Sequence, residues 1–92
     1  MSVRVKIPTQ VRVLVGGVNE LDVSPTPTVG DLFRMIGQDH PELVDRIFDE
    51  EGLIRRFINV YVGDEDVRFL QGLDTPIEEG SVVSILPAVA GG

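Results

Sequence analysis

The first residues of the chain alternate between apolar and charged side chains. Val3, Val5 and Ile7 are apolar, whereas Arg4 and Lys6 between them are cationic. Successive side chains of a strand point to opposite faces, so a period of two predicts a strand with one buried face. We therefore expect a strand whose apolar side chains enter the core and whose two cations face solvent.

A second alternating stretch follows Pro8, which cannot donate a hydrogen bond to a strand ladder. Residues 11–15 carry a valine at every second position, and Gly16-Gly17 after them is a turn signal. Residues 18–23 predict the returning strand. The first third of the chain is interpreted as a β-hairpin with a wide, irregular loop.

The middle of the chain predicts two helices. Thr28 stands where an N-cap is expected, and Asp31 three residues later completes a pattern that resembles a capping box. Gly37 is expected to end this helix. Its apolar residues recur at helical spacing and form one face: Val29, Leu32, Phe33 and Ile36. A second, short helix is expected after Pro41, with an apolar stripe of Leu43, Val44, Ile47 and Phe48.

The last third predicts three further strands. Residues 55–62 form the most regular of them, Gly63-Asp64 provides a hairpin turn, and residues 66–69 form a short return strand. Residues 72–77 are a compact connector with a turn of 3₁₀ helix. The final strand is expected at residues 81–86.

This order of elements predicts an α+β fold, because a helix packed on one face of a mixed sheet is a stable layered arrangement. The β-grasp, or ubiquitin-like, roll is the common fold with that order, and its first and last strands lie side by side in the centre. We expect a mixed five-stranded sheet with one main helix on one face. Residues 1–86 would form the β-grasp domain and residues 87–92 a flexible C-terminal tail.

Strand alternation also predicts the composition of the other face of the sheet. Asn59 and Ser84 are polar, so we expect the strand face that carries them to be exposed to solvent. The residues expected to share that face are Phe57, Tyr61, Leu86, Arg4 and Lys6. Exposed aromatic side chains beside cations are typical of a protein interface, so we interpret these residues as a partner interface. Partial cover of this face by loops or by the tail is the alternative.

Composition and charge narrow the classes of function. Ninety-two residues make one domain, and the net charge of −7 favours basic protein partners over nucleic acid or anionic membranes. The absence of cysteine excludes disulfides, thiolate metal sites and a thiol nucleophile. One histidine, His40, cannot form a zinc site alone, so no metal is expected.

No constellation of catalytic side chains is visible, so we expect no catalytic residues and no enzymatic activity of the chain's own. No apolar run approaches the roughly 18 residues of a membrane span, and the first residues lack a signal-peptide core. We expect a cytoplasmic protein without membrane contact that is a monomer when free.

The last seven residues, 86–92, contain no charge and no hydrogen-bonding side chain. They span at most roughly 20 Å when extended, at about 3.3–3.6 Å per residue, which is enough to enter a partner's active site. Glycines lack a Cβ and fit a channel too narrow for other residues. The residues expected to thread into such a channel are Pro87, Ala88, Val89, Ala90 and Gly91. Taken alone, this segment fits a functional tail or a frayed end, and the α-carboxylate of Gly92 is the one chemically distinctive group.

The tail sequence Pro-Ala-Val-Ala-Gly-Gly of residues 87–92 resembles that of the ubiquitin-like sulfur-carrier family. Members of this family include the small subunit of molybdopterin synthase and the thiamine and cysteine-pathway carriers. Four further segments are most similar to the cysteine-biosynthesis branch: residues 7–9, 56–62, 64–69 and 85–87. The resemblance covers roughly the full length of the chain.

The resemblance implies a sulfur carrier. A ubiquitin-activating-like adenylyltransferase/sulfurtransferase would use ATP to adenylate Gly92 and convert it to a thiocarboxylate, with no cofactor bound to the carrier itself. A cysteine synthase would take the sulfur, and a metal-dependent peptidase would release the cysteine. Two alternatives remain open: donation of sulfur to a molybdopterin synthase large subunit, and conjugation of the Gly-Gly end as a protein modifier.

Overall fold

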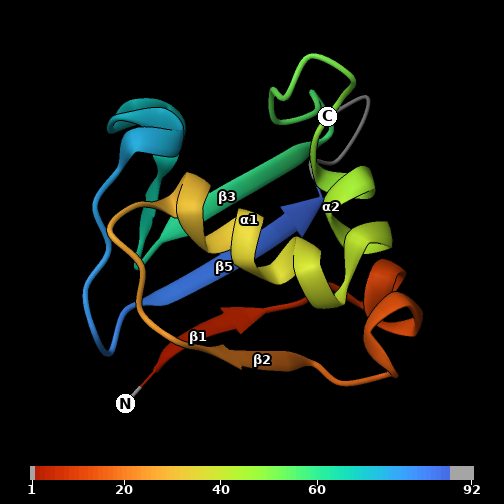
Figure 1. Cartoon of the computed structure of the whole chain (residues 1–92). Coiled ribbons are helices and arrows are strands. Elements are labelled where there is room, and N and C mark those ends of the chain that lie inside the picture. The colour runs from red at the N-terminus through yellow and green to blue at the C-terminus, as the bar shows by residue number, and fades with distance from the viewer. Residues whose placement is uncertain (1, 88–92) are drawn as a thin grey trace.

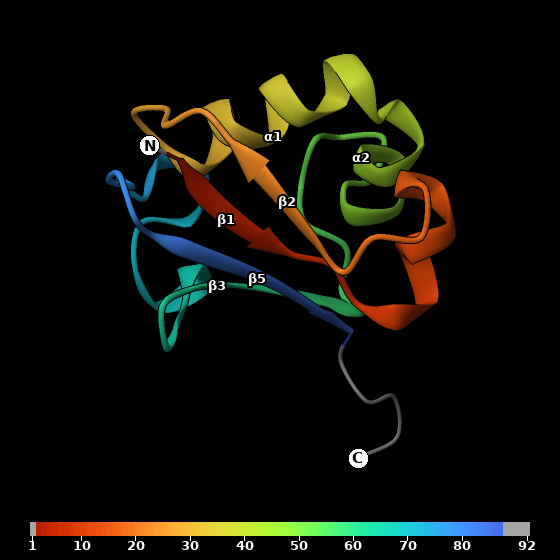
Figure 2. The same ribbon diagram turned by 90° about the horizontal axis from the view of Figure 1, so that it is seen from below.

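The computed structural model of the chain describes residues 2–87. Five strands form one sheet, and two α-helices cover one of its faces (Figures 1 and 2). The strands are β1 (Val3–Lys6), β2 (Glu20–Val23), β3 (Ile58–Val62), β4 (Glu65–Asp66) and β5 (Val82–Pro87). The helices are α1 (Val29–Asp39) and α2 (Pro41–Ile47), with 3₁₀ turns η1 (Thr9–Val15), η2 (Val67–Phe69) and η3 (Gly72–Asp74). None of the helices described is long and apolar enough to cross a membrane.

The strand order is β2-β1-β5-β3-β4, so the first and last strands lie side by side in the centre. β1 and β5 run parallel, with Val5 beside Val83, and all other neighbours are antiparallel. The predicted β-grasp roll is confirmed. This arrangement makes the final strand a central element of the sheet.

Strand alternation predicted the buried face correctly. Val3, Val5 and Ile7 are at most 2% exposed, and Val60 and Val83 of the neighbouring strands are at most 1% exposed. Leu32 and Phe33 of α1, with Leu43 and Ile47 of α2, cover them from the other layer. The cations of β1 face the opposite side, which we call the outer face of the sheet.

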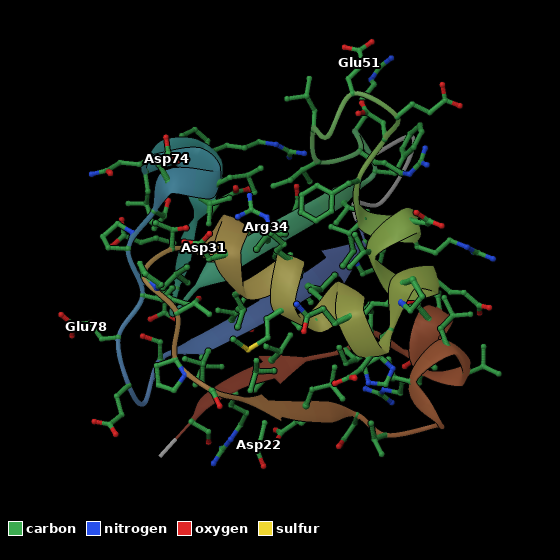
Figure 3. The ribbon with its side chains drawn as sticks, viewed as in Figure 1. Asp22, Asp31, Arg34, Glu51, Asp74 and Glu78 are labelled. Carbon is green, nitrogen blue, oxygen red and sulfur yellow. The ribbon has the colours of Figure 1, made fainter. Side chains whose placement is uncertain are left out.

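Helix α1 begins where the capping pattern predicts. The Asp31 backbone N–H donates to the Thr28 hydroxyl at 3.2 Å, and that hydroxyl donates to the Asp31 carboxylate at 3.0 Å. Figure 3 shows Asp31 and Arg34 together on this helix, where their side chains form an ion pair at 3.0 Å. The predicted end of the helix is wrong: Gly37 lies inside α1, which continues to Asp39.

The expected strand at residues 11–15 is also wrong, because these residues form η1. Pro8 ends the first strand and stands at the N-cap of this 3₁₀ helix, and Gly16 ends it in a left-handed conformation with φ of 76°. The alternating valines do not share one buried face: Val15 is buried, whereas Val13 is 81% exposed. The return strand begins only at Glu20.

Three further boundaries differ from the prediction. Residues 55–57 precede β3 as a turn that the Ile58 N–H closes by donating to the Arg55 carbonyl at 3.0 Å. β4 ends at Asp66, whose carboxylate accepts the Arg68 N–H at 2.9 Å and caps η2 instead of continuing the strand. β5 runs from Val82 to Pro87, one residue later at each end than the strand expected at residues 81–86.

Candidate functional site

The registers of the sheet bring most of the predicted interface residues together on its outer face. Lys6 lies beside Ser84 of β5, and Ser84 lies beside Tyr61 of β3. Leu86 lies two residues further along β5 on the same face and is 46% exposed. The two α-helices lie on the opposite face, as Figure 2 shows. Lys6, Tyr61 and Leu86 therefore form one continuous surface.

Phe57 is brought to the same region by a different route from the one predicted. It does not belong to β3 but to the turn at residues 55–58. Since Ile58 is the partner of Pro87 in the register, this turn lies beside the end of β5. The Phe57 side chain is 61% exposed, which makes it available to a partner.

Arg4 lies on the outer face but at its other end. It pairs with Val82, the first residue of β5, and its Nε lies 3.5 Å from a carboxylate oxygen of Glu20. The remaining predicted residues therefore lie near Pro87. Arg4 is separated from Pro87 by nearly the full length of β5, in which each residue adds a rise of about 3.3 Å.

A groove of about 470 Å³ lies beside the end of β5, on the side of β1 and away from β3 and the Phe57 turn. Lys6, Leu86 and Pro87 contribute to its walls, and Pro8 and Arg12 close it from the first turns of η1. The Arg12 side chain is fixed there, since its Nε donates to the Ile7 carbonyl at 3.0 Å. The last described residue of the sheet is thus flanked by the Phe57 turn on one side and by this groove on the other.

The residues expected to thread into a partner, Ala88 to Gly91, and the expected sulfur-carrying residue Gly92 lie outside the described residues. Pro87 alone of the predicted threading residues is placed, as the end of β5. A proline is tolerated here because of the hydrogen-bonding pattern between β3 and β5. The Gly63 N–H donates to the Val82 carbonyl, so Gly63 and Val82 form a hydrogen-bonded pair, and such pairs alternate with pairs that are not hydrogen-bonded along antiparallel strands. The pair of Ile58 and Pro87 is consequently not a hydrogen-bonded one, and β3 needs no donor from the proline.

The acidic side chains of residues 2–87 do not gather into a metal site. Glu51 and Glu78 extend outward from loops at different edges of the molecule, as does Asp74 on η3 (Figure 3). Among residues 2–87, no group of three or more histidine, cysteine, aspartate or glutamate side chains is arranged to hold a metal ion.

The sequence interpretation missed the role of Arg68, which was placed on a strand that ends before it. Its guanidinium reaches β3 and donates to the Asn59 side-chain oxygen at 2.7 Å and to the Ile58 carbonyl at 2.8 Å. The signal in the sequence was Asp66. An aspartate side chain often accepts a hydrogen bond from the backbone N–H two residues later, and the turn that this forms can end a strand.

Known proteins resemble this chain over its whole length. Residues 5–92 match the model of the ThiS family. The sulfur carrier protein CysO of Mycobacterium tuberculosis is 43% identical over 94 residues, which covers 100% of both chains.

Solved structures are similar as well. A chain in the crystal structure of the Amycolatopsis orientalis BexX/CysO complex has a TM-score of 0.86 and 41% identity, covering 99% of this chain and 100% of that one. The small archaeal modifier protein SAMP1 of Methanosarcina acetivorans has a TM-score of 0.82 and 30% identity, covering 99% and 96%. On the full-length match of sequence and fold, the chain belongs to the ThiS family.

Proposed function

We propose that this chain is a sulfur carrier that holds sulfur as a thiocarboxylate on the C-terminal carboxylate of Gly92 and donates it in cysteine biosynthesis. The observation that carries the proposal is the 43% identity to the sulfur carrier protein CysO, over an alignment that spans the whole of this chain. The position of β5 supports it, because a central strand of the sheet leads directly to the residues that would enter a partner.

The chemistry starts from a carboxylate, which is a poor electrophile. A partner adenylyltransferase would join the Gly92 carboxylate to AMP from ATP and release pyrophosphate, which gives an acyl adenylate. Hydrosulfide then attacks the acyl carbon, AMP leaves, and a thiocarboxylate remains. The carrier supplies the acyl group and the recognition surface, whereas ATP binds to the partner.

The outer face of the sheet near Pro87 is the surface that we assign to partner recognition. Lys6, Tyr61 and Leu86 lie on it, and Phe57 borders it from the neighbouring turn. An activating enzyme and a cysteine synthase have to accept the same C-terminal residues in succession, so each would contact this region in turn. The similarity to a chain found in the BexX/CysO complex supports a carrier that works by docking to other proteins.

The receiving step tests the assignment to cysteine biosynthesis. Thiocarboxylated carrier, O-phosphoserine and the cysteine synthase of the same organism should yield a carrier extended by one cysteine, with phosphate as the leaving group. A metal-dependent peptidase should then release that cysteine. If only a molybdopterin synthase large subunit consumes the sulfur, the cysteine assignment is wrong and the molybdopterin alternative is correct.

Protein modification is a second candidate, favoured by the likeness to the small archaeal modifier protein. Here the adenylated Gly92 would be attacked by a lysine amine instead of a sulfur nucleophile, and the product would be an isopeptide. Lysine-linked adducts that form in cells of the source organism and depend on Gly92 would support this function. Their absence, with thiocarboxylate present, would favour the carrier alone.

A further inference from the structure

The turn at residues 55–58 presents an exposed aromatic side chain beside the end of β5. The Ile58 N–H closes the turn by donating to the Arg55 carbonyl at 3.0 Å, and Phe57 within it is 61% exposed. Short exposed turns are among the segments that open most easily, so contacts that hold the backbone of this turn also hold the position from which Phe57 projects.

The edge of β3 beside this turn lacks a neighbouring strand. Since the pair of Ile58 and Pro87 is not hydrogen-bonded, the Ile58 carbonyl points away from β5, toward the side of β4. β4 ends at Asp66, the partner of Tyr61, so no strand of the described chain continues beside Ile58. The carbonyl is therefore left to accept from water or from a side chain.

Arg68 supplies this donor. Its Nη2 donates to the Ile58 carbonyl at 2.8 Å and to the Arg55 carbonyl at 3.2 Å. Its Nη1 donates to the Asn59 side-chain oxygen at 2.7 Å. One planar guanidinium therefore joins the first carbonyl of the turn, the last carbonyl of the turn and the first outward-facing side chain of β3.

The charge of Arg68 is directed to these neutral acceptors. The two ion pairs found among residues 2–87, Arg4 with Glu20 and Arg34 with Asp31, do not include it. Hydrogen bonds from a charged donor are shorter and stronger than those between neutral groups. Such a side chain holds its acceptors more firmly than a neutral donor would.

We propose that Arg68 is a positioning residue for partner recognition: it replaces the missing strand beside Ile58 and fixes the turn so that Phe57 meets the protein that receives the C-terminal residues. This inference rests on the proposed function for its partner. Arg68 acts through the turn and through Phe57, and it makes no contact with the reacting carboxyl group.

The first test needs no partner. In Arg68→Ala, the Ile58 amide should exchange with solvent at least about tenfold faster than in the wild type, since opening of the turn exposes it. The Val83 amide in the central strand should keep its protection. Arg34→Ala, which removes an exposed arginine on α1, is the matched control and should leave Ile58 unchanged. Unchanged exchange of Ile58 in Arg68→Ala would overturn the proposal.

The second test asks whether Arg68 acts through Phe57. With the adenylating enzyme of the same organism, ATP and sulfide, Arg68→Ala and Phe57→Ala should each raise the KM for the carrier by about tenfold and leave kcat nearly unchanged. The double variant should be no worse than Phe57→Ala alone, because neighbours that act as one unit are not additive. Arg68→Lys, which keeps the charge and one donor group, should recover part of the loss.

Additive losses in the double variant would show that Arg68 does not work through Phe57 and would overturn the proposal. Failure of the wild type to form a thiocarboxylate would contradict the proposed function instead. The exchange of the Ile58 amide would still decide whether Arg68 holds the turn.

Discussion

Ile58 is the partner of Pro87 in the antiparallel register between β3 and β5. This pair links the turn that carries Phe57 to the last described residue of the central strand. Lys6 and Leu86 lie near the same end of the sheet, where both are on the outer face and both line the neighbouring groove. Recognition by a partner and delivery of the C-terminal residues are therefore expected to occur at one end of the sheet.

Leu86→Ala should weaken partner recognition without unfolding the protein. The side chain is 46% exposed on the outer face, so its loss should change the free energy of unfolding by less than about 1 kcal/mol. Truncation of an interface anchor typically costs more than about 1 kcal/mol of binding, or several-fold in affinity. Titration of the adenylating enzyme with the carrier measures this.

Met35→Ala is the matched control for that experiment. Met35 is also an exposed apolar residue, 36% exposed, but it lies on α1 in the opposite layer. It should leave the affinity unchanged. An equal loss in both variants would argue against the outer face as the recognition surface.

Thr28→Ala should lower the free energy of unfolding by about 1 kcal/mol, because it removes the N-cap of α1. The Asp31 N–H would lose its acceptor at 3.2 Å, and the Asp31 carboxylate would lose a donor at 3.0 Å. Urea denaturation followed by circular dichroism measures the change. Ser24→Ala, at an exposed hydroxyl in the preceding connector, should unfold at the wild-type midpoint.

Two glycines of α1 should respond differently to alanine. A Cβ on Gly30 would lie 3.2 Å from the backbone carbonyl oxygen and 3.3 Å from the Cβ of Leu73, which cannot move without shifting η3. A Cβ on Gly37 would meet mainly the Cγ2 of Val44, at 3.2 Å, a side-chain methyl that can yield. Alanine in a helix interior gains about 1 kcal/mol over glycine.

Gly30→Ala should therefore be less stable than the wild type, and Gly37→Ala should be at least as stable. Thermal unfolding of the two variants gives the comparison directly. The reverse order would mean that the contact between α1 and η3 is looser than the structure shows.

Local patterns predicted the elements whose stability comes from local chemistry and from burial of one face. The alternation around Val5 and the capping pattern of Thr28 and Asp31 both led to the correct structure, since each acts within a few residues. Val13 shows the limit of the same reasoning. Its alternating neighbours Val11 and Val15 suggested a strand, but they pack on the core from the 3₁₀ turn η1 while Val13 faces solvent.

The site was predicted in part for a related reason. The parity of Tyr61 and Leu86 followed from their strands, so their shared face was predictable. The contribution of Arg68 depends on where β4 stops and on which carbonyl of β3 is left without a neighbour. That information is tertiary, and an isolated arginine in a sequence does not contain it. The role of Gly92 came from the tail and from the family resemblance, and it stays a prediction.

Removal of Gly92 should abolish sulfur loading while leaving folding intact. The core residues of the described chain lie between Val3 and Ile85, so their contacts with one another are retained in a chain that stops at Gly91. The unfolding midpoint in urea should match that of the full chain. A lower midpoint would indicate that the terminal glycine contributes to the fold instead of to transfer.

Intact-protein mass spectrometry of the carrier, after incubation with its adenylating enzyme, ATP and a sulfide source, tests the central claim most directly. The mass should increase by the exchange of one oxygen for one sulfur, and fragmentation should place the change at Gly92. The same treatment without ATP, or with the chain that ends at Gly91, should give no increase. An unchanged mass for the full chain, with an enzyme shown to be active on another carrier, would contradict a thiocarboxylate on Gly92.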